Sequence, residues 1–296
     1  MRTSGRSCTV PCGSNGAMSS ETARKTWRTA EPIHGFIYFL PEAAAAYEAL
    51  GPVGPRTGYF ASRSAPMGAV PAEVVVSTFY NFNPSLVHDA MKGAWDIATP
   101  AKWTATRLAA VDAGLSRGWG GAVDTPEIRE LAGLLRAAAE VACGSPEGRP
   151  LFAGHASLEW PDAPHLVVWH AQSLLREFRG DGHIAALVTE NIGGLEALVT
   201  HAGAGDVTAK VLASSRAWPE NEWDAAVDSL RSRGICDAEG NLTAEGRAQR
   251  DRIEERTDEL AAAPYDALGE ERCERVRELA RPLSRMIVDS GMIGFR

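Results

Sequence analysis

The sequence predicts an all-α, multi-helix protein with one small β-hairpin in its C-terminal third. From Trp27 onward, apolar residues recur at helical spacing in most segments, and prolines or glycines separate these segments. Residues 235–243 differ, because two short apolar pieces flank Glu239-Gly240-Asn241, a pattern typical of a hairpin turn. A length of 296 residues allows one large domain or two ordinary ones.

The first half of the chain is expected to form an N-terminal helical domain, residues 24–150, preceded by a disordered tail, residues 1–23. The tail is rich in Gly, Ser and Thr and shows no periodicity. Met18 has the surroundings of a natural start, so residues 1–17 are interpreted as an upstream extension or a cloning remnant. Residues 72–82 begin with a β-branched run and fit either a strand or a buried helix. Helices are expected at 27–40, 41–50, 85–95, 100–119 and 126–143.

The second half, residues 151–296, is expected to hold the central helices and a helix-turn-helix unit. Gly180 and Gly182 lower helical propensity, so the central region is predicted as two helices that meet near these glycines. Thr243 has the position of an N-cap before a long polar helix that ends at Pro264. Helices are expected at 164–178, 183–201, 206–217, 219–233, 243–263 and 268–289.

The segment around the predicted hairpin carries a recognisable pattern, D-x-x-G-x-L-T-x-E-G-R. Its matching residues are Asp237, Gly240, Leu242, Thr243, Glu245, Gly246 and Arg247. Over residues 206–262 this pattern resembles the winged helix-turn-helix of MarR-like proteins. The region from Trp27 to Gly291 is similar to an actinobacterial family of MarR-like winged-helix proteins of poorly defined function, through phrases such as STFYNFNP and LVVWHAQSLLREFRGDGHIAAL. The resemblance implies an all-α winged-helix fold and supplies no assigned catalytic residues.

The charge pattern disfavours DNA as a partner. The chain has a net charge of −8, whereas non-specific DNA binding depends on neutralising phosphates with basic side chains. The second helix of the predicted helix-turn-helix, which enters the major groove in such motifs, is itself acidic. It carries Glu220, Glu222, Asp224 and Asp228 against Arg231 and Arg233. The helix-turn-helix is therefore interpreted as a packing module more readily than as a DNA-binding one.

The strongest candidate site lies in residues 167–187, where ionisable groups are interleaved with apolar ones. Histidines can transfer protons near neutral pH, so His170, Asp181 and His183 are the predicted catalytic residues, with Asp181 orienting a histidine. Arg176 and Arg179 are predicted to bind an anionic part of the substrate. The alternative is an interhelical salt-bridge network that stabilises a tight turn at residues 179–182, and the sequence leaves both open.

A second candidate set combines aromatic and polar side chains from the first half of the chain. Such groups line pockets for organic ligands, and the alternative is a core helix with Tyr hydroxyls at the surface. Arg63 either holds an anion or caps a helix end. The set predicted to contact substrate is His34, Tyr38, Arg63, Tyr80 and Asn81.

No metal or cofactor is predicted. His155, His165, His170 and His183 follow one another at spacings of 10, 5 and 13 residues, which match no recognised metal-binding pattern. The five cysteines are scattered and odd in number, which favours a reduced cytoplasmic protein without a disulfide framework. No apolar run reaches the roughly 18–20 residues that a membrane helix needs, so no membrane association is expected.

The leading functional hypothesis is a small-molecule enzyme of specialised metabolism that uses acid–base chemistry, with hydrolysis, elimination and isomerisation all open. One alternative is a MarR-like transcriptional regulator that binds DNA, responds to a ligand and forms a symmetric dimer. Another is a non-catalytic protein that sequesters a metabolite or confers resistance. Turnover, salt-sensitive DNA binding and unchanged release of a ligand distinguish the three.

Overall fold

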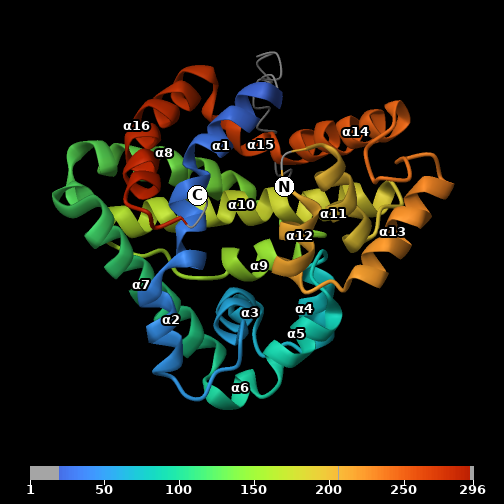
Figure 1. Ribbon diagram of the computed structural model, residues 1–296. Coiled ribbons are helices and arrows are strands. Elements are labelled where there is room, and N and C mark those ends of the chain that lie inside the picture. Colours follow the sequence, from blue (N-terminus) through green and yellow to red (C-terminus); the bar gives the residue numbers. More distant parts are fainter. Residues whose placement is uncertain (1–19, 206, 294–296) are drawn as a thin grey trace, which may run out of the picture.

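The computed structural model describes residues 20–205 and 207–293, which are helical apart from short connections (Figure 1). The α-helices are α1 (Ser20–Gly35), α2 (Pro41–Glu48), α3 (Thr57–Ser64), α4 (Ala72–Thr78), α5 (Pro84–Met91), α6 (Ala94–Ile97), α7 (Pro100–Trp119), α8 (Pro126–Cys143), α9 (Pro150–Ala156), α10 (Pro164–Thr189), α11 (Gly194–Gly203), α12 (Ala209–Arg216), α13 (Glu220–Ser232), α14 (Ala244–Ala261), α15 (Ala263–Leu268) and α16 (Glu270–Asp289). Three short 3₁₀-helices join them, namely η1 (Phe36–Phe39), η2 (Ala65–Met67) and η3 (Gly120–Asp124). The prediction of an all-α, multi-helix fold is confirmed for these residues.

The long helix α10 runs through the middle of the molecule, and other helices pack around it (Figure 1). It contacts α1, α8, α9 and α14. In the view of Figure 1, α1, α14, α15 and α16 lie above α10, α2 to α6 lie below it, and α11 to α13 lie toward its C-terminal end. Side chains of α10 can therefore face both the N-terminal helices and the C-terminal third.

Proline and a polar N-cap set the starts of several helices. The side chains of Asn83, Thr99 and Thr125 accept hydrogen bonds from backbone N–H groups in the first turns of α5, α7 and α8. Each of these helices then has proline at its first position, where the missing N–H costs nothing. The start predicted at Thr125-Pro126 is confirmed. The ambiguous run after Pro71 is helical as α4, and it buries Val75 and Thr78.

The predicted β-hairpin wing is wrong. Among the described residues there is no strand, and residues 235–243 form only an isolated antiparallel bridge between Cys236 and Leu242. Two local effects prevent a longer ladder. The Asp237 carboxylate accepts the backbone N–H groups of Glu239 and Asn241 and closes the turn at once. Helix α14 then begins so close that a Cβ at Gly246 would lie 2.0 Å from the carbonyl oxygen of Ile235. The second arm therefore ends in a helix before a strand can form.

The central region also differs from the prediction. Helix α10 continues through Gly180 and Gly182, whereas two separate helices were expected. Arg149 explains one of these glycines, since a Cβ at Gly182 would lie 2.7 Å from the Arg149 Nη1 atom. That guanidinium donates to the carbonyl oxygens of Phe178 and Leu260 and so joins α10 to the end of α14. Gly182 therefore leaves room for the Arg149 side chain beside α10, and the helix continues through it.

Two apolar cores hold the helices together. The main core takes residues from α1 to α10, α15 and α16, on both sides of the boundary predicted at residue 150. A smaller core joins the end of α10 to α11, α13, the 235–242 loop and α14. Helix α1 begins at Ser20, so residues 20–23 of the predicted disordered tail are helical, while residues 1–19, with Cys8 and Cys12, lie outside the described residues. No helix in the described part of the chain is long and apolar enough to cross a membrane.

Candidate functional site

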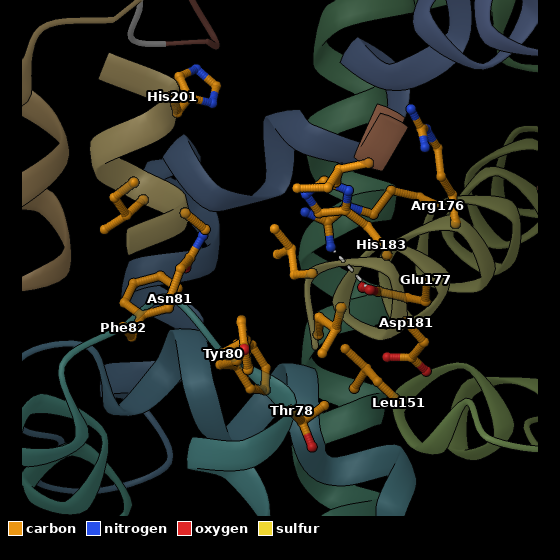
Figure 2. A pocket seen from close by; sticks show the side chains of 18 of the residues that line it. Thr78, Tyr80, Asn81, Phe82, Leu151, Arg176, Glu177, Asp181, His183 and His201 are labelled. Atoms are coloured by element: carbon orange, nitrogen blue, oxygen red, sulfur yellow. Dashed lines mark hydrogen bonds and ion pairs between the residues drawn. The ribbon is translucent and has the colours of Figure 1, made fainter. Parts of the chain in front are cut away.

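A cavity of about 470 Å³ lies between the N-terminal helices, α10 and the C-terminal third; we call it the first cavity. Figure 2 shows His201 and Asn81 on one side of it and Arg176, Glu177 and Asp181 on the other. Its charged and histidine wall residues are Glu31, Arg63, Arg176, Glu177, Arg179, Asp181, His183, His201, Arg216, Arg250 and Glu254. Five arginines therefore face four carboxyl groups and two histidines in one cavity of a protein that is acidic as a whole.

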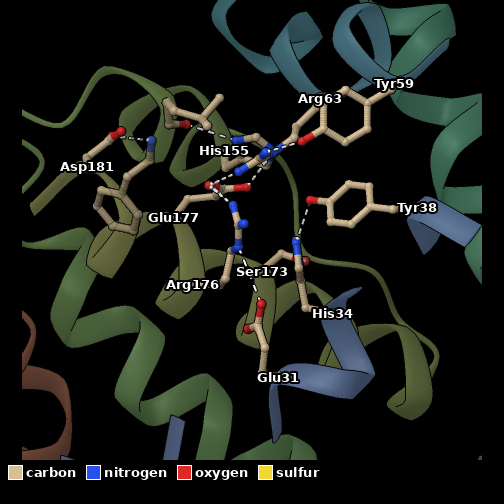
Figure 3. Close-up of polar contacts among 12 residues, drawn as sticks. Glu31, His34, Tyr38, Tyr59, Arg63, His155, Ser173, Arg176, Glu177 and Asp181 are labelled. Carbon is tan, nitrogen blue, oxygen red and sulfur yellow. Dashed lines mark hydrogen bonds and ion pairs between the residues drawn. The ribbon is translucent and has the colours of Figure 1, made fainter. Parts of the chain in front are cut away.

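The centre of the charged wall is a bidentate ion pair between α3 and α10. Arg63 donates from Nε and Nη2 to the two carboxylate oxygens of Glu177, at 3.0 and 2.8 Å (Figure 3). Its remaining Nη1 donates to the Tyr59 hydroxyl at 2.9 Å. Both members of the pair are buried. Burial raises the pKa of Glu177, but Arg63 and the nearby histidines outweigh it and hold this pKa below its ordinary value. This is the fork geometry that satisfies a buried carboxylate.

Arg176 extends the network to a second carboxyl group on α1. It donates to Glu177 at 2.9 Å and lies 3.6 Å from Glu31 Oε1. Burial, together with the negative charge of Glu177, raises the pKa of Glu31 to about 8. The Oε2 atom of Glu31 is buried and has no hydrogen-bond partner among the described residues. The side chain as a whole is 31% exposed and lines the first cavity. Glu31 is therefore a neutral acid near pH 7 that faces the first cavity.

The predicted catalytic residues are not brought together. Asp181 accepts the backbone N–H of Phe152 at 2.9 Å, and burial raises its pKa to about 6. His183 bonds through Nδ1 to the Thr257 hydroxyl, and burial lowers its pKa. Both line the first cavity, without a hydrogen bond between them. His170 lines neither this cavity nor a second one, because its ring packs edge-on against Trp160, and burial lowers its pKa to about 4.

Arg179 is held by α14 rather than by its neighbour Asp181. Its Nη2 atom lies 3.0 Å from Asp258 and 3.3 Å from Glu254, and its guanidinium lies over the ring of Trp27. Arg179 thus pairs between helices, as the salt-bridge alternative has it, but residues 179–182 belong to the continuous helix α10 and form no tight turn. The salt-bridge alternative describes Arg179 better than substrate binding does.

The aromatic set divides between two places. His34 donates from Nδ1 to Ser173, whose hydroxyl donates to the Trp169 carbonyl, so His34 Nε2 accepts the hydroxyl of Tyr38 at 2.7 Å. Burial lowers the pKa of His34 well below its ordinary value, which keeps the ring neutral and this order of donors fixed. Tyr38 and His34 lie away from the first cavity.

Tyr80 and Asn81 belong to its wall. The Tyr80 hydroxyl donates to the carbonyl of Ile192, and the Asn81 carbonyl accepts Trp218 Nε1. Both contacts attach the connection between α4 and α5 to the C-terminal third. A Cβ at Gly194 would lie 1.8 Å from the Tyr80 carbonyl oxygen, so α11 begins in direct contact with this connection.

Sequence reasoning missed Glu31, Glu177, Arg216 and Arg250 as site residues. Glu177 stands in the singled-out segment, and its i,i+1 position beside Arg176 gave no sign that Arg63 is its main partner. Arg216 and Arg250 line the first cavity, and neither forms an ion pair within residues 20–205 and 207–293. Burial lowers the pKa of Arg216, and its Nε atom has no hydrogen-bond partner.

The helix-turn-helix adjoins the first cavity. Helix α12 ends at Arg216, the next residue, Ala217, has a φ of 57° that turns the chain, and α13 begins at Glu220. The acidic residues of α13 are exposed. Its two basic neighbours are occupied, because Arg231 pairs with Asp228 and Arg233 pairs with Glu196. Little positive charge is left on α13 for phosphate groups.

The described residues form an all-helical protein in which Arg216, the last residue of α12, brings the helix-turn-helix to the wall of a charged cavity. The chain belongs to a helix-turn-helix family, whose model matches residues 23–294. No curated protein and no solved structure matches the chain.

Proposed function

We propose that the protein is a small-molecule enzyme that uses acid–base chemistry in the first cavity on a substrate with an anionic group. The carrying observation is the composition of the cavity wall: two arginines without a carboxylate partner in the described chain face the same space as two carboxyl groups with raised pKa values. A volume of about 470 Å³ is in the range of small-molecule sites. Titratable groups with perturbed pKa values gather where proton transfer is needed.

The proposal gives each residue a role. Glu31, protonated at neutral pH, is the proton donor, and Asp181, ionised above about pH 6, is the acceptor. Arg216 and Arg250 hold the anionic group of the substrate. Arg63 is a positioning residue, since its guanidinium is saturated by Glu177 and Tyr59. Hydrolysis, elimination and isomerisation all remain compatible with these roles.

The test is untargeted turnover of an actinobacterial metabolite extract, followed by mass spectrometry. Wild-type protein should deplete at least one metabolite and produce another, and Glu31→Gln should lose this activity while it stays folded. Glu42→Gln is the matched control, because Glu42 forms an exposed pair with Arg117 far from the cavity wall. A metabolite that is bound and returned unchanged would support the sequestering alternative and contradict the enzyme.

A second candidate, a MarR-like regulator, is favoured by one specific observation. Helices α11 and α12 supply His201 and Arg216 to the wall of the first cavity, so a ligand there would contact the helix-turn-helix directly. Such a regulator should bind DNA with an affinity that falls steeply with salt, as a symmetric dimer. DNA binding that is unchanged by Arg231→Met and Arg233→Met together would contradict contact through α13.

A further inference from the structure

A second cavity, of about 490 Å³, is lined by an adjoining face of α3. Its walls are η1, α2, the connection before α3, α3 itself and one residue of α7, and it shares only Tyr59 with the first cavity. Its lining residues are Ile37, Tyr38, Leu40, Ala43, Ala44, Tyr47, Glu48, Val53, Gly54, Pro55, Arg56, Gly58, Tyr59, Ser62 and Arg107. The function proposed above uses none of these side chains.

Arg107 is the unusual member of this wall. Four arginines are buried in the described part of the chain, and three of them have a carboxylate partner: Arg63 with Glu177, Arg179 with Asp258, and Arg277 with Glu274. Arg107 is only 4% exposed, and within residues 20–205 and 207–293 it has no carboxylate within 4 Å. A guanidinium cannot lose its proton in a protein, so this buried charge stays uncompensated in the structure.

The contacts that Arg107 does make are weak. Its Nη1 and Nη2 atoms lie 3.4 Å from the hydroxyls of Ser62 and Tyr38, and its Nε atom is buried without a partner. The rings of Tyr38 and Trp169 lie 5.4 and 5.5 Å from its guanidinium carbon and offset part of the burial cost. Because Tyr38 gives its proton to His34, its oxygen can only accept from Arg107. The donors of Arg107 therefore lack a strong acceptor.

Aliphatic and tyrosine side chains line most of the rest of the second cavity, with Glu48 and Arg56 as its other charged residues, and its two ends differ. Arg107 and Ser62 are buried at the deep end, and Ile37, Leu40 and Ala43 are buried along the wall. Ala44, Glu48, Pro55 and Arg56 are exposed and mark the opening. One buried cation with a hydroxyl beside it suits a single carboxylate, and apolar walls between this cation and the opening suit an aliphatic or aromatic body.

We propose that the second cavity binds an amphipathic monocarboxylate, with its carboxylate on Arg107 and Ser62 and its apolar body along α2 and η1 toward the opening. The bound carboxylate supplies the counter-ion that Arg107 lacks. The neutral alcohol of the same chain length offers the same apolar body without the charge, so it binds poorly.

The test is isothermal titration calorimetry with decanoate below its micelle concentration at pH 7.5, with 1-decanol as the neutral counterpart. Wild-type protein should bind decanoate at least about tenfold more tightly than decanol, because a charge-assisted pair with a buried arginine is the main difference between them. Arg107→Met should weaken decanoate binding by a similar factor. Arg129→Met is the matched control, since Arg129 on α8 is exposed and pairs with Asp124 of η3, and it should bind decanoate as wild type does.

Thermal unfolding separates a binding role from a structural one. Arg107→Met should unfold at a temperature no lower than wild type, because it removes an unpaired buried charge and keeps most of the side-chain volume. Ala44→Trp provides a second variant that does not touch the core, since Ala44 is exposed on α2 and a tryptophan there narrows the opening. It too should weaken decanoate binding. Absence of decanoate binding, equal binding by Arg107→Met or Ala44→Trp, or equal binding of decanol would each overturn the proposal.

Discussion

Arg63 and Arg107 are two buried arginines that lie over the ring of the same tyrosine, Tyr38, yet their electrostatic surroundings are opposite. Arg63 is saturated by a bidentate carboxylate and a tyrosine hydroxyl. Arg107 has two long contacts to hydroxyls and no carboxylate among the described residues. The difference teaches that a buried charge by itself does not mark a site. The presence or absence of a carboxylate partner distinguishes a structural arginine from one whose N–H donors are available to a ligand.

The largest expected effect comes from breaking the paired side of this comparison. Glu177→Gln leaves Arg63 and Arg176 without their shared carboxylate, which should lower the free energy of unfolding by about 3–5 kcal/mol, as for other broken buried pairs. Urea unfolding measures it. Glu42→Gln, in the exposed pair with Arg117, should cost no more than about 1 kcal/mol. Equal losses in the two variants would mean that burial of the pair has no energetic consequence.

The next prediction tests whether the Arg63–Glu177 pair contributes net stability, or whether only the removal of one partner is destabilising. Replacing both members, Arg63→Met together with Glu177→Leu, removes the charge and its partner at once. This double variant should be about 2 kcal/mol more stable than Glu177→Gln, because it removes the buried Arg63 charge that Glu177→Gln leaves without a carboxylate, whereas the partly exposed Arg176 loses Glu177 in both variants. The same urea titration applies. A double variant less stable than the single one would show that the pair contributes net stability.

The pH dependence sharpens the comparison within the network, since the two carboxyl groups near Arg176 have pKa values shifted in opposite directions. The pKa of Glu31 rises from 4.5 to about 8 on folding, so between these values the folded state holds a proton that the unfolded state has lost. Its contribution to stability is present at low pH and is lost as the pH rises from about 4.5 to 8. The pKa of Glu177 is lowered, so its contribution is present above about 4.5 and is lost at lower pH.

Unfolding free energies measured between pH 4 and pH 8 check this sign. Glu31→Gln should gain stability relative to wild type as the pH rises through this range, because glutamine has no proton to lose. A difference between wild type and Glu31→Gln that is constant from pH 5 to pH 8 would contradict a raised pKa for Glu31.

The smallest effect concerns Tyr59, whose hydroxyl accepts from Arg63. Tyr59→Phe removes one hydrogen bond and leaves the bidentate pair with Glu177 intact, so the cost should be about 1 kcal/mol. Thermal or urea unfolding measures it. A loss of stability as large as that of Glu177→Gln would mean that the Tyr59 hydroxyl stabilises the buried Arg63 as much as the Glu177 carboxylate does.

The sequence predicted which helix of the centre carries ionisable groups, but not what these groups contact. Residues 167–187 stood out because charges alternate with apolar residues, and several of them do face the first cavity. The partners of Glu177 and Arg179 come from α3 and α14, far away in the chain. No local spacing encodes such pairs. For this reason nothing in the sequence distinguished Glu31 and Arg107 from the other charged residues of their amphipathic helices.

The secondary structure was predictable where local chemistry decides it. Thr125-Pro126 fixes the start of α8, and local patterns predict α2, α7 and α8, whereas no helix was predicted at α3 and the one predicted at residues 85–95 is divided between α5 and α6. Prediction was wrong where a tertiary contact decides. The early start of α14 prevents a hairpin at residues 235–243, and Gly182 accommodates Arg149 beside a continuous α10.

Tyr59 is the single residue common to both cavities, and it is also bonded to the central ion pair. Its ring is therefore part of the wall of both cavities. A ligand in the second cavity that displaces this ring changes the shape of the first cavity and the hydrogen bond between Tyr59 and Arg63. If a ligand in the first cavity changes the affinity of the second cavity by some factor, thermodynamic linkage requires that a ligand in the second cavity change the affinity of the first cavity by the same factor.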